Sequence, residues 1–98
     1  MEYEIKEFEN KEFGKIRVID IAGQTWFVGK DIADALGYEK SRNAILMHVD
    51  AEDKTDVLMK DTGSSYKSKV IIVNESGLYS LILSSRLSSA RLFKHWVT

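Results

Sequence analysis

The apolar residues change their spacing part-way along the chain, and this change limits the folds that it can adopt. Residues 15–21 (KIRVIDI) and 25–28 (TWFV) are rich in β-branched and aromatic side chains, which predicts two strands. Gly23-Gln24 separates them, and glycine in the first of two loop positions indicates a hairpin with a type II′ turn. Apolar residues then recur at i, i+4, i+7 and i+8, which is the spacing of one helical stripe. The stripe consists of Val28, Ile32, Ala35 and Leu36.

The helix that carries this stripe is predicted over residues 29–36. Asp31 lies in its first turn, at the positive end of the helix dipole, and Gly37 suits the position just after its end. Ser41 is then the expected N-cap of a second, short helix that ends at His48. A strand hairpin followed by two helices favours a mixed α and β domain.

Further strands are predicted at the start of the chain and in its second half. Tyr3 and Ile5 alternate with glutamates, which indicates an edge strand with a charged face. Residues 50–56 are expected to form a polar connector. Residues 57–59 and 66–73 predict two more strands, and the polar residues between them suit a hairpin loop. That loop is Asp61-Thr62-Gly63-Ser64-Ser65.

Two more helices are predicted towards the end of the chain. Asn74 is placed to cap residues 75–84, whose apolar side chains cover most of the circumference, so this helix is expected to be the most buried. Ser88 or Ser89 can cap a last, amphipathic helix from about Ala90. Its apolar arc consists of Leu92, Phe93, Trp96 and Val97, and its polar arc of Arg91, Lys94, His95 and Thr98.

Together these elements predict an α+β fold, in which antiparallel β-hairpins pack against about four helices. A length of 98 residues fits a single domain that spans residues 1–98. The hairpin over residues 15–28 and the helices that begin at Gly29 and Glu75 are expected to share one core. The side chains expected to be largely buried are Leu78, Ile82 and Trp96.

The residue types of the chain exclude several classes of protein. It has no cysteine, which excludes disulfides, thiolate metal sites and a cysteine nucleophile, and which is compatible with a reducing cytosol. No apolar run approaches the roughly 20 residues of a membrane span, and the acidic, alternating N-terminus is unlike a signal peptide. His48 and His95 are far apart in the sequence, and no close-set ligand cluster accompanies them. We therefore expect no metal and no cofactor.

Candidate catalytic residues do not form a recognisable set. His48 ends a short helix without an adjacent nucleophile, so a structural role is favoured over that of a base. The many serines match no nucleophile motif. Lys30, Asp31 and Asp34 are interpreted as a solvated face rather than as an acid/base pair. An enzyme is therefore the least favoured class.

The charges are separated along the chain, although the net charge is only −1. From Ser76 to Thr98 there is no acidic residue, and separated charges permit nucleic-acid binding even near neutrality. A pI of about 6.1 argues against a strong electrostatic binder, and a lopsided but ordinary surface stays an alternative. The candidate nucleic-acid-binding residues are Lys40, Ser41, Arg42, Lys67, Lys69, Arg86, Arg91 and Lys94. For the first three, a loop and capping role is equally open.

Four strings, in this order and spacing, resemble the Bro-N domain, the N-terminal domain of phage antirepressors and of the Bro proteins of large DNA viruses. The strings are WFVGKDIADALGY (26–38), AILMHVDAEDK (44–54), VNESGLYSLILSSRL (73–87) and FKHWVT (93–98). The resemblance implies a nucleic-acid-binding domain followed by a separate C-terminal domain in a longer protein. It differs at Ser88, where family members commonly have proline, and the family pattern continues with more helix beyond Thr98.

Two functions follow from these observations. The first is a DNA-binding regulatory domain of a phage or prophage antirepressor, acting in the cytoplasm of the bacterial host and controlling viral or prophage gene expression. The alternative is a protein-interaction module that sequesters a repressor or a host factor without contacting DNA. An exposed aromatic cluster or a long unpaired edge strand near residues 3–8 would favour the alternative. The sequence also leaves a homo-oligomer open.

Overall fold

A computed structural model describes residues 4–11, 14–60 and 67–85 of the chain. The strands are β1 (Glu4–Asn10), β2 (Gly14–Ile21), β3 (Gln24–Val28), β4 (Lys54–Lys60) and β5 (Lys67–Val73). The helices are α1 (Gly29–Ala35), α2 (Ser41–His48) and α3 (Glu75–Ser84), with one turn of 3-10 helix at Ala51–Asp53. The predicted hairpin loop over 61–65 and the predicted last helix from Ala90 lie outside the described residues.

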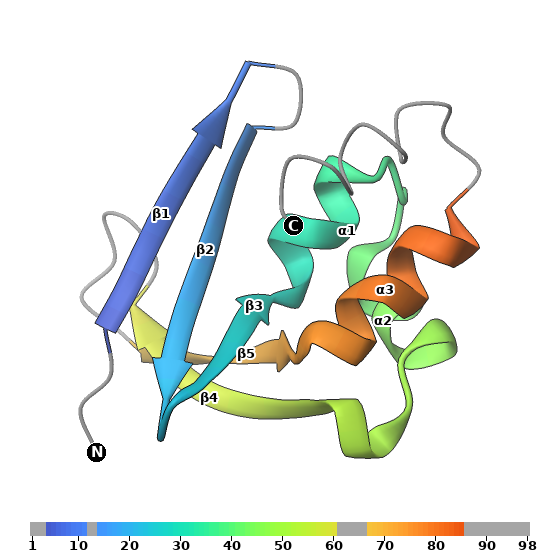
Figure 1. Ribbon diagram of the computed structural model, residues 1–98. Coiled ribbons are helices and arrows are strands. Elements are labelled where there is room, and N and C mark those ends of the chain that lie inside the picture. The colour runs from blue at the N-terminus through green and yellow to red at the C-terminus, as the bar shows by residue number, and fades with distance from the viewer. Residues whose placement is uncertain (1–3, 12–13, 61–66, 86–98) are drawn as a thin grey trace.

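The α+β class is confirmed, and the two predicted hairpins are parts of one five-stranded sheet. Its strand order is β1-β2-β3-β5-β4, and every neighbouring pair is antiparallel. The prediction of about four helices was too high for the part of the chain described, which holds three α-helices. The sheet is strongly twisted, so that the β1–β2 hairpin crosses over β4 and β5 (Figure 1). β1 and β4 are the two edge strands, and the first of these confirms the edge strand predicted at the N-terminus.

The turn between β2 and β3 differs from the predicted one by one residue. Ile21 pairs with Gln24, so the two loop residues are Ala22 and Gly23 rather than Gly23 and Gln24. Both have positive φ, 50° and 82°, which is the backbone of a type I′ turn. Type I′ matches the right-handed twist of the strands, but it places Ala22 in a left-handed conformation that L-residues adopt at a cost.

The sheet is joined at its centre by a short contact. β4 and β5 pair along their whole lengths, from Lys54 opposite Val73 to Lys60 opposite Lys67. β3 and β5 are joined by only two pairs, Phe27 with Val73 and Val28 with Ile72, because the chain leaves the sheet at Gly29 to form α1.

The polar connector predicted over residues 50–56 is shorter than expected, because β4 already begins at Lys54.

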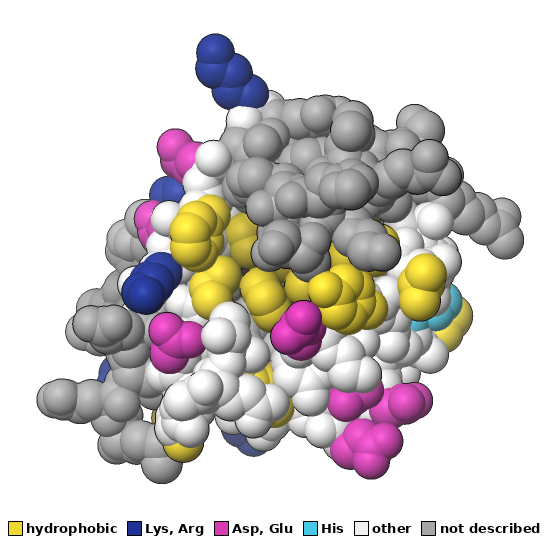
Figure 2. Space-filling view, viewed as in Figure 1, with side chains coloured by type: hydrophobic (Ala, Val, Ile, Leu, Met, Phe, Trp, Pro, Cys, Tyr) yellow, Lys and Arg dark blue, Asp and Glu magenta, His cyan; other side chains and the backbone are white. Residues whose placement is uncertain are grey.

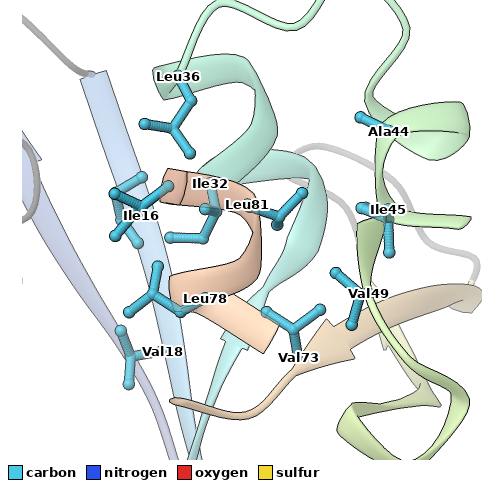
Figure 3. Packing of buried hydrophobic residues seen from close by; sticks show 11 residues of the cluster. Ile16, Val18, Ile32, Leu36, Ala44, Ile45, Val49, Val73, Leu78 and Leu81 are labelled. Carbon is cyan, nitrogen blue, oxygen red and sulfur yellow. The ribbon is translucent and has the colours of Figure 1, made fainter. Parts of the chain in front are cut away.

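The main core lies between β2, the end of β5 and the three helices (Figure 3). Its buried members include Ile16 from β2, Ile32 from α1 and Ile45 from α2. Leu78 and Ile82 of α3 are 1% and 7% exposed, which confirms their predicted burial and the shared core. Trp96, predicted to join them, lies outside the described residues.

The composition of α3 suggested a helix that is buried all round, but only one of its faces is buried. Leu83 is 83% exposed, whereas Leu78 and Leu81 on the inner face are almost completely covered. Gly77 lets this helix approach the sheet, since a Cβ there would lie 3.0 Å from both Val49 Cγ1 and Val73 Cβ. One face of α3 therefore packs closely, and the other is available to solvent.

A second apolar cluster is built by strand residues alone. Ile19, Val28, Met59 and Ile72 are buried there, and Trp26 packs against them half-buried. Successive strand residues face opposite sides of the sheet, so Trp26 contributes to this cluster and Phe27 to the main core. Both faces of the sheet thus carry apolar side chains.

The helix ends confirm two of the three caps that were predicted within the described residues, and the cap at Ser88 or Ser89 lies outside them. Asn74 Oδ1 accepts a hydrogen bond from Gly77 N at 2.9 Å, as an N-cap does. Gly37 has φ 82°, and the N–H groups of Gly37 and Tyr38 donate to carbonyls of the last turn of α1, the pattern of a Schellman motif. The N-cap of α2 is Lys40 and not Ser41, because Ser41 already has helical geometry and its hydroxyl bonds elsewhere.

Candidate nucleic-acid interface

A groove of about 630 Å³ opens between α1, the start of α2 and the first half of β5. Arg17 of β2 and Lys30 of α1 stand on one side of it, and Lys69 of β5 lines another part. The remaining lining residues are Asp34, Glu39, Lys40, Ser41, Arg42, Asn43, Ile45, Ser68, Val70 and Ile71. Five basic and two acidic side chains therefore line this groove.

The fold brings together four of the eight residues predicted to bind nucleic acid. Lys40, Ser41 and Arg42 come from the start of α2, and Lys69 comes from β5, 27 positions after Arg42. Lys67 is exposed two residues before Lys69 on the same strand but is not part of the lining. The predicted residues Arg86, Arg91 and Lys94 lie outside the described part of the chain.

Arg17 is held rigidly at the wall of the groove. Asp31 Oδ2 accepts hydrogen bonds of 2.9 Å from both the backbone N and the Nε of Arg17, and Asp31 Oδ1 accepts one of 3.0 Å from its Nη2. The two side chains are only 17% and 12% exposed. The interpretation of Asp31 as part of a solvated face was therefore wrong, because the carboxylate joins α1 to β2.

A second, exposed ion pair lies within α1, and a hydrogen bond joins it to α2. Lys30 Nζ donates to Asp34 Oδ2 at 2.7 Å, and the Ser41 hydroxyl donates to Asp34 Oδ1. Partial burial raises the pKa of Asp34, but the hydrogen bonds from Lys30 and Ser41 and the charge of Lys30 outweigh it, so the pKa is lowered overall. The same pairing raises the pKa of Lys30.

Three cations of the groove are left without a carboxylate partner among the described residues. Lys40, Arg42 and Lys69 are exposed, and none of them has an ion pair with another part of the described chain. Arg17 and Lys30 are each paired with an aspartate. The net positive charge of the groove therefore comes from Lys40, Arg42 and Lys69, and the negative charge of Glu39 offsets part of it. A polyanion is the natural ligand for such a surface.

The floor of the groove includes part of a strand edge. Ser68, Lys69, Val70 and Ile71 all line it, and in this stretch β5 has β4 on one side and no described strand on the other. On β2 the comparable stretch is closed, because Asp31 accepts from the backbone N–H of Arg17. No side chain of the described residues makes such a bond to residues 68–71 of β5.

The described residues show where His48, interpreted from the sequence as structural, lies in the fold. They contain no group of three or more metal-ligating side chains. His48 is half-buried, with its ring centroid 5.7 Å from that of Tyr38. Tyr38 in turn donates its hydroxyl hydrogen to Leu81 O at 2.8 Å, so this pair lies between α1, α2 and α3. Within the same described residues, no helix is long and apolar enough to cross a membrane.

Arg17 and Lys30 are groove residues that the sequence did not single out. Arg17 stands in a β-rich run, where a lone cation is an ordinary surface residue, and its partner lies 14 positions away. The spacing of Lys30 and Asp34, i to i+4 on a helix, was the one available signal for the second pair.

Comparison with known proteins gives one consistent result. The profile described as "BRO family, N-terminal domain" matches residues 15–98. A Bro-N domain-containing protein of invertebrate iridescent virus 6 is 31% identical over 98% of this chain, and a second one from that virus is 29% identical over 85%. An uncharacterized protein of Haemophilus influenzae is 35% identical over 82% of the chain. The chain spans between about a quarter and two fifths of these relatives, covering 27%, 24% and 39% of their lengths. No solved structure matches the chain.

Proposed function

The chain belongs to the BRO family as its N-terminal Bro-N domain, and from this we propose that it is the DNA-binding regulatory domain of a phage or prophage antirepressor. In this proposal it acts in the cytoplasm of the bacterial host and controls viral or prophage gene expression. It needs no cofactor and catalyses no reaction. The chain covers only 27% and 24% of the two viral relatives, so its DNA-binding role is proposed for this domain within a longer protein.

One observation supports the proposal above the others: Lys40, Arg42 and Lys69 meet at one groove with no described carboxylate paired to them. Phosphate contacts by lysine and arginine supply most of the affinity of non-specific DNA binding. Asp31 holds the Arg17 guanidinium and matches its charge, so Arg17 is not counted among the phosphate contacts. We propose that Lys67, Arg86, Arg91 and Lys94 extend this phosphate-binding surface, and that Ser41 supplies at most a secondary contact because Asp34 already accepts its hydrogen bond.

The test is the salt dependence of duplex DNA binding by the triple variant Lys40→Ala, Arg42→Ala and Lys69→Ala. If each side chain neutralises one phosphate, the slope of log affinity against log salt should fall by about 2.7. The matched control is Lys6→Ala, which removes an exposed lysine on the edge strand β1 and should leave the slope unchanged. Fluorescence anisotropy at several salt concentrations measures both. An unchanged slope in the triple variant would show that these groove residues do not contact DNA phosphates.

The last predicted helix is tested in the same assay with the double variant Arg91→Ala and Lys94→Ala. A loss of two phosphate contacts should flatten the slope by about 1.8 and weaken different DNA sequences about equally. A slope equal to that of the unaltered chain would contradict a role for this segment in DNA binding.

A second candidate, capture of a repressor or host protein without DNA, is favoured by the edge strand β1. Its side chains Ile5 and Phe8 are 46% and 51% exposed, and they lie on opposite faces of the strand. Figure 2 also shows hydrophobic side chains gathered across the middle of one face of the molecule. The two candidates separate in one assay, the release of a cognate repressor from its operator. Under the DNA-binding proposal the triple variant loses this activity, whereas under the second candidate it keeps the activity and Phe8→Glu abolishes it.

A further inference from the structure

We propose that the open half-edge of β5 accepts an extended, acidic segment of a partner protein as an added β-strand. The proposal does not depend on DNA binding, although both ligands would use the same groove. It rests on three observations: an incomplete strand pairing, a groove that exposes this edge, and cations beside it that have no ion pair among the described residues. Together they specify both the backbone and the side chains of the partner.

The first observation is the incomplete pairing between β3 and β5. β3 ends opposite Ile72, while β5 continues back to Lys67 with β4 alone beside it. Within a strand the N–H and C=O of one residue point to the same edge, and those of the next residue point to the opposite edge. The Ile71 carbonyl oxygen is directed away from β4, because it lies 3.2 Å from the position that a Cβ of Gly29 would occupy. Alternation then directs the N–H and C=O of Lys69 to this same edge.

The second observation is that this edge can be reached from outside. Ser68, Lys69, Val70 and Ile71 line a groove of about 630 Å³, and the first two are exposed. A strand of about five residues is roughly 17 Å long and lies about 4.8 Å from its neighbour. Such a segment would continue the line of β3 along β5. Val70 and Ile71, which are half-buried, offer it apolar contacts beside the polar backbone.

The third observation is the charge around the edge. Lys40, Arg42 and Lys69 have no ion-pair partner in the described part of the chain, so acidic side chains on an added strand would find oppositely charged groups beside it. A phosphate backbone fits the cations but not the edge, because phosphate oxygens accept hydrogen bonds and cannot donate to the carbonyl of Lys69. A peptide backbone supplies both a donor and an acceptor at strand spacing.

The experiment measures binding of a labelled peptide of about seven residues that alternates glutamate and valine, with the 98-residue chain as receptor. Two N-methylated versions serve as matched ligands, one methylated on the odd residues and one on the even residues. Each retains the charges and removes the N–H donors of one edge only. We expect one version to bind about tenfold or more weakly and the other to bind like the parent, because only one edge of the peptide can face β5. A peptide that alternates lysine and valine should not bind.

Two further measurements concern the protein rather than the peptide: the affinity of charge-reversal variants and the hydrogen exchange of a backbone amide. Lys69→Glu keeps the backbone and reverses the charge, and it should weaken the parent peptide about tenfold or more, whereas Lys6→Glu on β1 should not. Bound peptide should also slow hydrogen exchange of the Lys69 amide, which an interaction through side chains alone would not do. Equal binding by both N-methylated peptides, or an unprotected Lys69 amide, would overturn the proposal. Duplex DNA binding with no peptide binding at millimolar concentration would assign the groove to nucleic acid alone.

Discussion

Replacement of Asp31 by asparagine is the sharpest test of how the groove wall is built. The side chain keeps its size, but the negative charge and one of the two acceptor oxygens are lost. Asp31 accepts three hydrogen bonds from Arg17, so an asparagine leaves at least one of these donors facing an NH₂ group. The Arg17 guanidinium then stays mostly covered without a counter-charge.

The size of the effect follows from the exposure of the pair. Removal of one partner from a fully buried ion pair costs about 3–5 kcal/mol. The side chains of Arg17 and Asp31 are 17% and 12% exposed, so water reaches part of the guanidinium, and we expect a loss of about 2–4 kcal/mol. With an unfolding entropy of about 0.2 kcal/mol/K for a chain of this length, this corresponds to a fall in Tm of about 10–20 °C.

Thermal and urea unfolding followed by circular dichroism at neutral pH would measure this loss. Asp34→Asn is the matched control, because it makes the same change one helical turn later in a pair that is 69% and 48% exposed. The control should change the free energy of unfolding by less than about 1 kcal/mol. Equal losses in both variants, or a change below about 0.5 kcal/mol for Asp31→Asn, would refute the view that burial makes the first pair important.

Four further predictions concern single residues. Ala22→Asn should raise the free energy of unfolding by about 0.5–1 kcal/mol, since asparagine tolerates positive φ and Asn-Gly suits a type I′ turn; urea midpoints measure the gain. Asn74→Ala should cost about 1 kcal/mol through loss of the α3 N-cap, and Asn74→Ser should restore most of it. Leu78→Ala should cost about 2–5 kcal/mol and Leu83→Ala under about 0.5 kcal/mol, and the reverse order would contradict the placement of α3. The pKa of Asp34 in the folded protein lies below its ordinary value of 3.8, so ionised Asp34 stabilises the fold above that pH, and this stabilisation is lost as the pH falls below it. Asp34→Asn should remove this part of the acid sensitivity, which unfolding measured between about pH 2 and 6 would show.

Local signals in the sequence predicted local structure well. The cap at Asn74 and the glycine at position 37 depend on hydrogen bonds within a few residues, so their chemistry is readable directly from the chain. The β2–β3 turn was placed one residue too late, since glycine suits either loop position and the choice is made by the strand register. That register pairs Ile19 with Trp26, a contact between side chains that the turn residues do not encode.

The groove was only partly predictable, because its residues meet through tertiary contacts. Lys40, Arg42 and Lys69 were identified as cations from the sequence, but nothing in their spacing shows that α2 and β5 line the same groove. Their meeting depends on the pairing of β3 with β5, which connects distant parts of the chain. Asp31 was misjudged for the same reason, since its partner Arg17 lies on the preceding hairpin.

The two-pair contact between β3 and β5 also bears on how the chain folds. Its partners, Phe27 with Val73 and Val28 with Ile72, are 46 and 44 positions apart, whereas the other strand pairs of the sheet join neighbours in the sequence. Hairpins with local contacts form quickly. The contact between β3 and β5 must first close a loop of more than 40 residues, and the entropy cost of this closure comes before any stabilisation by the two residue pairs and the helix core. We therefore expect destabilising changes at Val28 or Val73 to slow refolding, and changes in the β1–β2 hairpin mainly to speed unfolding.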